Sequence, residues 1–266
     1  MPELPEVETI KRDLEKEITG KKIIEVCIHN PVVIKGISPD NFKRNLEGAV
    51  FKNILRRAKV LILELSSGKS LVIHLKMTGQ LVYPGDGKKS RVGFRLSDGK
   101  TLDFNDQRLF AELRVLDDWR SLEFIQNLGP EPFDISVGQF KEMLSSRSTK
   151  IKPLLMEQSF ISGIGNLYAA ESLFRAKIRP ERPARSLADK EKEILFEEIK
   201  EVLNEAIKHG GSSVDNYVRV SGGKGDYAKY HRVYGREGKP CLVCKLPIKR
   251  ISLNGRGTYF CEHCQK

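Results

Sequence analysis

Long apolar runs are missing from the 266-residue sequence, tryptophan occurs once, and only one cysteine precedes residue 241. No segment approaches the roughly 20 apolar residues of a membrane-spanning helix, and the first residues are too acidic for a signal peptide. The single early cysteine argues against a secreted disulfide scaffold. Hydrophobic residues make up 39% and charged residues 30% of the chain, as in ordinary globular proteins. We therefore expect a cytoplasmic protein with no membrane partner.

Acidic residues are scarce at the end of the chain. Residues 210–266 carry 11 Lys or Arg against 4 Asp or Glu, whereas residues 1–209 carry 35 against 31. Most of the net charge of +11 therefore lies in a short final segment. A basic segment on a balanced body indicates a polyanionic partner, most often nucleic acid. A ribosome-like surface, or one that serves only solubility, is the alternative that charge alone leaves open.

Four of the five cysteines form two Cys-x-x-Cys pairs near the end of the chain: Cys241, Cys244, Cys261 and Cys264. The residues between the pairs are typical of two strands, 247–253 and 257–260, joined by an Asn254-Gly255 turn. Thiolate pairs brought together by a hairpin make a tetrahedral ligand set, which predicts one structural Zn²⁺. A redox pair or disulfides are the competing interpretations, and His263 could replace one cysteine.

Apolar periodicity divides the rest of the chain into a strand-rich and a helical part. A helix is expected from Pro5 to Gly20. Short branched runs then predict an antiparallel sandwich or barrel, with strands at Ile23–Ile28, Val50–Leu55, Val60–Leu65, Leu71–Leu75 and Arg91–Leu96. Beyond a linker at 129–132, helices are expected at Val137–Leu144, Lys152–Gln158, Asn166–Ala176 and Leu187–His209. A long glycine-rich loop, 218–230, precedes the cysteine hairpin.

Two short segments have chemistry that is suited to DNA. The turn 160–166 contains Gly163 and Gly165 before a helix start, where free N–H groups can bind phosphate, although an ordinary helix connection is the alternative. At the N-terminus, removal of methionine would expose the secondary amine of Pro2. The reference pKa of an α-amino group is about 7.7–8.0, so such an amine is partly unprotonated at pH 7. It can therefore attack a sugar aldehyde to form an iminium ion, with the Glu3 carboxylate to move protons.

Several motifs occur together in the order of one known family. Residues 1–9, Met-Pro-Glu-Leu-Pro-Glu-Val-Glu-Thr, and 255–264, Gly-Arg-Gly-Thr-Tyr-Phe-Cys-Glu-His-Cys, resemble the termini of bacterial formamidopyrimidine-DNA glycosylases. Between them lie the similar motifs at 56–59, 74–77, 163–168 and 210–213. The resemblance implies an α+β, multidomain fold. Its expected parts are an N-terminal antiparallel β-sandwich (1–131), a helix–two-turn–helix domain with a lesion-capping loop (132–234) and a β-hairpin zinc finger (235–266).

The same resemblance implies three catalytic residues. Pro2 resembles the nucleophile that attacks the anomeric carbon of the damaged nucleotide, and Glu3 resembles the acid that protonates the deoxyribose ring oxygen. Lys59 matches a lysine that contacts phosphate beside the lesion. Without the resemblance, Lys59 would be interpreted as a solvated lysine in a turn between two strands.

Six further residues match DNA contacts of the family. Met77 and Phe110 resemble side chains that fill the gap left by the flipped nucleotide, while Arg108 resembles the one that faces the orphaned cytosine. The backbone-phosphate ligands of the family are matched by Lys152, Asn166 and Arg256. Without the resemblance, Met77 would be interpreted as a core methionine, and Arg108 and Phe110 as an ordinary surface pair.

The implied activity is that of a bifunctional DNA glycosylase and AP lyase. It would excise 8-oxoguanine and formamidopyrimidines from double-stranded DNA, act as a monomer at the bacterial nucleoid, and cleave by β,δ-elimination. An endonuclease VIII-type enzyme for oxidised pyrimidines is the alternative, which Leu4 and the loop length disfavour. A DNA-binding protein without catalysis is a third. Ala111, in place of the usual glycine, and Asp215-Asn216, in place of a basic residue, depart from the family pattern and put lesion preference in doubt.

Overall fold

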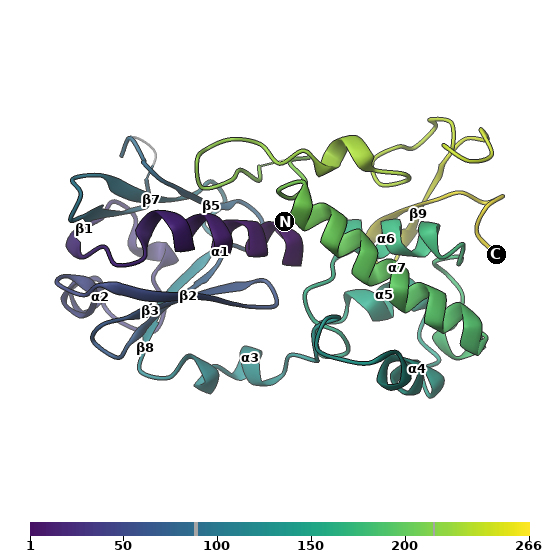
Figure 1. Ribbon diagram of the computed structural model, residues 1–266, viewed down its shortest axis with the longest axis horizontal. Coiled ribbons are helices and arrows are strands. Elements are labelled where there is room, and N and C mark those ends of the chain that lie inside the picture. Colours follow the sequence, from purple (N-terminus) through teal and green to yellow (C-terminus); the bar gives the residue numbers. More distant parts are fainter. Residues whose placement is uncertain (88–89, 215) are drawn as a thin grey trace. The chain divides into compact units, whose positions relative to one another are not determined.

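The computed structural model describes residues 1–87, 90–214 and 216–266, which form two compact units (Figure 1). The first unit comprises Met1–Gln126 and Ile207–Ala228, and the second comprises Asn127–Ala206 and Lys229–Lys266. The segment 207–228 therefore packs within the unit that holds the N-terminus. The domain limits expected from the sequence, 1–131, 132–234 and 235–266, stay predictions. Asp215, which together with Asn216 departs from the family pattern, lies outside the described residues.

The described part of the first unit contains two four-stranded antiparallel sheets. One has the order β1 (Ile23–Ile28), β6 (Val92–Leu96), β7 (Thr101–Asp106) and β5 (Gly79–Val82). The other has the order β2 (Phe51–Arg57), β3 (Val60–Leu65), β4 (Ser70–His74) and β8 (Glu112–Leu116). Branched residues at alternate positions of these strands face the layer between the sheets. The expected antiparallel β-sandwich is thus confirmed.

Helix α1 (Leu4–Ile18) covers the open side between the two sheets (Figure 1). Val7, Ile10 and Leu14 recur at helical spacing and join one core with residues of both sheets. Each such fully buried side chain contributes about 1.5–3 kcal/mol to folding. Two further helices, α2 (Pro39–Leu46) and α3 (Glu123–Gln126), were not expected from the sequence. The N-cap hydroxyl of Ser38 accepts from the Asn41 N–H at the start of α2.

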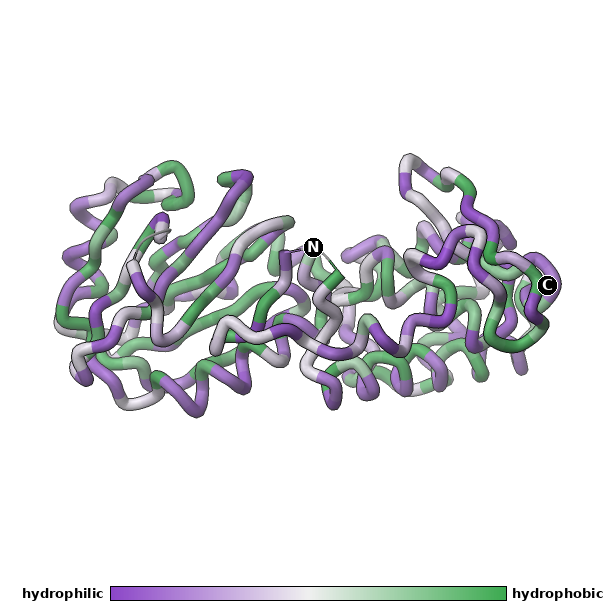
Figure 2. Tube along the Cα trace, turned by 90° about the horizontal axis from the view of Figure 1, so that it is seen from above, coloured by the Kyte–Doolittle hydropathy of each residue, from purple (hydrophilic) through white to green (hydrophobic). Residues whose placement is uncertain are grey.

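The second unit contains four helices among its described residues and a two-stranded hairpin. The helices are α4 (Val137–Ser145), α5 (Ile151–Met156), α6 (Asn166–Arg175) and α7 (Asp189–Lys208); the strands are β9 (Lys249–Leu253) and β10 (Arg256–Phe260). Single 3₁₀ turns occur at Pro31–Val33, Trp119–Ser121, Ala184–Ser186 and Tyr227–Tyr230. Figure 2 shows the amphipathic character of the long helices, with hydrophilic residues gathered on one side. The α+β class, with a helical region and a C-terminal hairpin, is confirmed.

In the described part of the chain, no helix combines the length and the apolar character that crossing a membrane requires.

Candidate functional site

The first two residues of the proposed catalytic set lie at the buried start of α1. Pro2 is buried, and Glu3 is the N-cap residue of α1 with 5% of its surface exposed. Glu3 and Glu6 form a capping box, in which the Glu3 N–H donates to Glu6 Oε2 at 2.8 Å. This reciprocal pair fixes the backbone that presents the residues before the helix. Met1 still precedes Pro2 in the structure and is half-exposed.

A distant segment is attached to the same helix start. Glu6 Oε1 accepts a hydrogen bond from the Ser212 N–H at 2.8 Å. Gly211 has φ +80°, and a Cβ there would lie 2.9 Å from the Tyr217 ring and 3.1 Å from Glu6 Cγ. Only glycine fits so close a contact in a left-handed conformation. Burial and the charge of Glu6 raise the pKa of Tyr217, so its hydroxyl stays protonated.

Lys59 lies in the hairpin turn between β2 and β3 and is buried, with 6% of its surface exposed. The turn is tied to α1 through Arg56, which donates to the Ala58 carbonyl at 3.0 Å and pairs with Glu8 at 2.9 Å. Although burial opposes ionisation, Arg56 and Arg12 hold the pKa of Glu8 below its usual value. The helix that begins beside Pro2 and the turn that carries Lys59 are therefore joined by an ion pair.

Met77, Arg108 and Phe110 occupy two loops of the first unit and differ from core residues in their exposure. Met77 is 38% exposed and Phe110 is 54% exposed, which is high for apolar side chains of this size. The Arg108 guanidinium lies 4.7 Å from the centre of the Phe110 ring. An ordinary core role for Met77 is therefore wrong, since its side chain reaches solvent.

His74, at the end of β4, is partly buried, and the sequence motif at 74–77 gave it no role of its own. Burial lowers its pKa to about 4, and the positive charges of Lys76 and Lys59 act in the same direction, against Glu112. The neutral ring accepts the Lys76 N–H at Nδ1 at 3.1 Å. A histidine at a strand end gives no signal of this burial in the sequence. At neutral pH, His74 is therefore an uncharged group among cations.

Lys152, Asn166 and Arg256 meet in the second unit. Lys152 is 1% exposed, and its ammonium donates to the Asn166 side-chain oxygen and, at 2.9 Å, to the Thr258 hydroxyl. Asn166 begins α6 and donates to the Gly257 carbonyl at 3.1 Å, which links that helix to β10. Lys152 and Arg256 line the same open cavity of about 360 Å³. The site offers a cation and a helix N-terminus together, the combination that binds phosphate.

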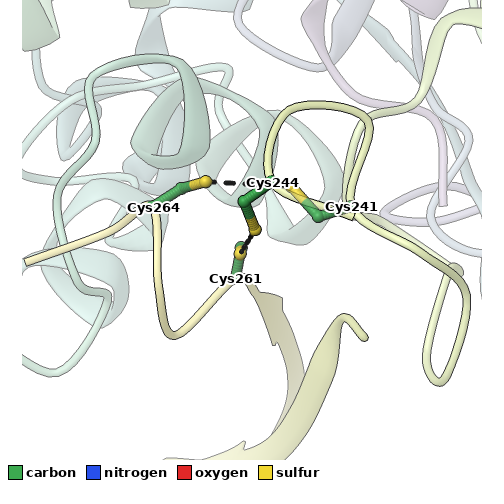
Figure 3. Close-up of side chains that lie close together, drawn as sticks. All are labelled: Cys241, Cys244, Cys261 and Cys264. Atoms are coloured by element: carbon green, nitrogen blue, oxygen red, sulfur yellow. Dashed lines mark hydrogen bonds between the residues drawn. The ribbon is translucent and has the colours of Figure 1, made fainter. Parts of the chain in front are cut away.

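The four sulfur atoms of Cys241, Cys244, Cys261 and Cys264 converge, as Figure 3 shows, from the turn before β9 and the turn after β10. All lie within 4.8 Å of one another, with Cys241–Cys264 at 3.9 Å and Cys244–Cys261 at 3.4 Å. Disulfides are excluded in this arrangement because a covalent S–S bond is about 2.0 Å long. Four thiolates around a tetrahedral Zn²⁺ lie about 3.8 Å apart, so the donor set fits zinc.

The thiols of the cluster differ in their pKa values. Against burial, the N–H groups of Cys244 and Val243 lower the pKa of Cys241 to about 7. Burial and the neighbouring thiols raise the pKa of Cys264 to about 12. A bound cation would compensate the negative charge of four thiolates at neutral pH. His263 is not part of the cluster within the described residues.

Comparison with known proteins identifies the family. Residues 1–113 match the formamidopyrimidine-DNA glycosylase N-terminal domain, residues 128–218 the H2TH domain of the same proteins, and residues 238–266 the zinc finger found in FPG and IleRS. A formamidopyrimidine-DNA glycosylase of Desulforamulus reducens is 43% identical, over 100% of this chain and 99% of that protein. The chain belongs to the formamidopyrimidine-DNA glycosylase family. Its members are DNA glycosylases of DNA repair, and this establishes the class of the present enzyme.

Solved structures of formamidopyrimidine-DNA glycosylases agree with this assignment. The MutM (Fpg) protein of Thermus thermophilus is 37% identical with a TM-score of 0.89, covering 99% of this chain and 98% of that one. A Lactococcus lactis Fpg mutant in complex with Fapy-dG containing DNA is 35% identical with a TM-score of 0.92, covering 100% of both chains. The Lactococcus lactis Fpg in complex with abasic-site DNA is 34% identical with a TM-score of 0.91, covering 99% of both.

Proposed function

We propose that this protein excises oxidised purines, 8-oxoguanine and formamidopyrimidines, from duplex DNA and then cleaves the strand by β,δ-elimination. The proposal rests on the full-length similarity to formamidopyrimidine-DNA glycosylases, together with a Pro2-Glu3 sequence at the start of α1. Duplex DNA as partner is supported by the two complexes of the Lactococcus lactis relative. The enzyme acts as a monomer in the cytoplasm, at the nucleoid while it scans DNA.

The chemistry begins once Met1 has been removed. The Pro2 nitrogen attacks the anomeric C1′ of the flipped nucleotide, the glycosidic bond breaks with its electrons leaving on the base, and the proton lost by the Pro2 nitrogen balances the charge of the departing base. Glu3 donates a proton to the ring oxygen O4′, so the sugar opens and an iminium ion forms between Pro2 and C1′. The iminium withdraws electrons, which lets the C2′ proton and the 3′-phosphate leave, followed by the C4′ proton and the 5′-phosphate. Hydrolysis of the iminium then frees the Pro2 amine.

The remaining residues bind and shape the DNA. Lys59, in the turn tied to α1 by Arg56, contacts the phosphate beside the lesion. The exposed Met77 and Phe110 fill the gap in the stack, and Arg108 donates to the orphaned cytosine. The cluster of Lys152, Asn166 and Arg256 binds backbone phosphate and reads no sequence.

One structural Zn²⁺ held by Cys241, Cys244, Cys261 and Cys264 completes the proposal. The metal supplies a cross-link between the two turns that flank the β9–β10 hairpin. Within the hairpin, Thr258 and Gly257 bond Lys152 and Asn166. The zinc finger thereby holds Arg256 beside Lys152 and Asn166.

Borohydride trapping tests the enzyme assignment. Protein confirmed by mass spectrometry to start at Pro2 is incubated with duplexes that contain 8-oxoguanine opposite cytosine, or thymine glycol. We expect a covalent adduct chiefly with the 8-oxoguanine duplex. The matched variant Glu3→Gln should give less adduct with the 8-oxoguanine duplex than with a duplex that contains a preformed abasic site. An adduct chiefly with thymine glycol would support the endonuclease VIII alternative. No adduct with either duplex would refute both enzymes.

A further inference from the structure

One buried carboxylate connects the two loops that carry the inserted side chains. Asp106, the last residue of β7, is 1% exposed. Its Oδ1 accepts hydrogen bonds from the Thr78 hydroxyl and from the Arg108 N–H, the latter at 3.2 Å. Its Oδ2 accepts the Ala111 N–H at 2.8 Å. Thr78 directly follows Met77, Arg108 is itself a donor, and Ala111 directly follows Phe110, so each of the three inserted residues is a donor to this carboxylate or adjoins one.

Both loops have backbones that need such support. In the first, the Gly79 N–H donates to the Leu75 carbonyl at 2.9 Å, and a Cβ at position 79 would lie 2.6 Å from that oxygen. Met77 therefore sits inside a tight turn. In the second, Leu109 adopts φ +58°, a left-handed conformation that costs a non-glycine residue about 1–2 kcal/mol. The Thr78 hydroxyl also accepts the Arg108 N–H at 3.1 Å, which joins the two turns directly.

The exposed side chains gain little orientation from packing. Met77 and Phe110 project into solvent, and the ring of Phe110 lies against the flexible side chain of Arg108. Their direction is therefore set by the backbone of the two loops. A shift of either loop would leave a buried N–H, hydroxyl or carboxylate oxygen without its partner, and such unpaired groups are costly.

We propose that Asp106 and Thr78 are positioning residues that hold Met77, Arg108 and Phe110 in one arrangement, and so determine selectivity for the base opposite the lesion. This inference rests on the proposed function, since the three side chains act only if the enzyme opens a duplex. Arg108 can distinguish cytosine from adenine only when its guanidinium is placed to within a fraction of an ångström. Through the Arg108 N–H, the Asp106–Thr78 pair fixes the backbone from which the Arg108 side chain extends.

Thr78→Val tests the proposal because it keeps the shape of the side chain and removes the hydroxyl. Thr78→Ser retains the hydroxyl, and Thr101→Val removes a hydroxyl from the other end of β7. Excision of 8-oxoguanine is measured under single-turnover conditions opposite cytosine and opposite adenine. Trapping on a single-stranded abasic oligonucleotide, which has no gap to fill, is measured alongside.

For Thr78→Val we expect excision opposite cytosine to fall by about tenfold to a hundredfold, the range for a small misplacement of a catalytic constellation. The cytosine-to-adenine ratio should fall towards one, while single-stranded trapping stays at the wild-type rate. Thr78→Ser and Thr101→Val should keep the wild-type ratio. Asp106→Asn, which retains only one acceptor oxygen, should show the same fall in excision and in the cytosine-to-adenine ratio. It provides the test if Thr78→Val fails to fold.

The outcomes separate this inference from the proposed function. Wild-type protein that neither excises nor traps would overturn the function itself. Wild-type protein that excises, with Thr78→Val folded and unchanged in its ratio, would overturn the positioning role alone. An equal loss by Thr78→Val on every substrate, single strand included, would show a general structural role and would also overturn it.

Discussion

Replacing Glu6 by glutamine should disturb the junction on which the catalytic end depends. The Glu6 carboxylate is 3% exposed and joins residues far apart in sequence, accepting from the Glu3 N–H and from the Ser212 N–H, each at 2.8 Å. An amide offers one oxygen where the carboxylate offers two. In Glu6→Gln, one of the two buried N–H groups would therefore face an NH₂ group and lose its acceptor.

The size of the effect follows from these two bonds. A hydrogen bond to a charged acceptor contributes about 1.5–3 kcal/mol, and an unpaired buried donor adds a desolvation penalty, so we expect the free energy of unfolding to fall by roughly 2–4 kcal/mol. For a domain of this size, each kcal/mol lowers Tm by about 2–4 °C. Trapping at an 8-oxoguanine duplex should slow as well, because the segment around Ser212 is no longer held at the start of α1.

Calorimetric melting of Glu6→Gln beside Glu15→Gln measures this effect. Glu15 is on the same helix, is exposed, and pairs with Lys11 at 2.7 Å. Loss of an exposed i,i+4 pair costs about 0.2–0.5 kcal/mol, so this control should melt close to wild type. If Glu6→Gln has the same Tm as Glu15→Gln, the two buried hydrogen bonds do not stabilise the junction and the reasoning is refuted.

Three further results are expected. Elemental analysis should find one zinc per chain, lost in Cys261→Ser together with binding to duplex DNA; full binding without zinc would contradict a structural role. The pKa of His74 is lowered to about 4 from the ordinary 6.5, so the neutral ring should add up to about 3 kcal/mol to the free energy of unfolding above pH 6.5. This stability should be lost as the pH falls towards 4. His74→Gln should flatten the pH dependence of Tm in that window, and an unchanged profile would refute the prediction. Lys152→Met should weaken binding of any duplex and reduce the salt slope by about one, checked by titration at several salt concentrations; an unchanged slope would exclude a phosphate contact.

Local patterns allowed much of the fold to be predicted. Alternating branched residues gave the strands from Ile23 to Leu75 nearly to the residue, and cysteine spacing predicted the cluster that the structure contains. Strand β5 (Gly79–Val82) was missed because it is short, begins with glycine and exists only by pairing with β7. Helix α2 was missed because Phe42 and Leu46 alone make its apolar face. These elements depend on tertiary contacts that no local window contains.

The candidate site was predictable only where its chemistry is local. Pro2-Glu3 and the two cysteine pairs are recognisable from neighbouring residues, since an amine, an acid and close thiols need little else. Glu171 shows the opposite case. Its buried carboxylate accepts the N–H groups of Arg232, Val233 and Tyr234 at 2.8, 3.0 and 2.8 Å, although some sixty residues separate them in sequence. A glutamate in an amphipathic helix gives no indication of such a partner.

Alanine at position 111, where the family usually has glycine, has a physical explanation in the structure. A glycine that usually follows the inserted phenylalanine suggests a left-handed residue there, yet the left-handed position in this loop is Leu109, at φ +58°, and Ala111 is not among the residues with positive φ. Ala111 is fully buried, and its N–H donates to Asp106. Leu109 packs against the core of the first unit, which offsets its backbone strain. Alanine is therefore compatible with the turn because position 111 is not left-handed, and the Ala111 N–H bonds the same Asp106 carboxylate that accepts the Arg108 N–H.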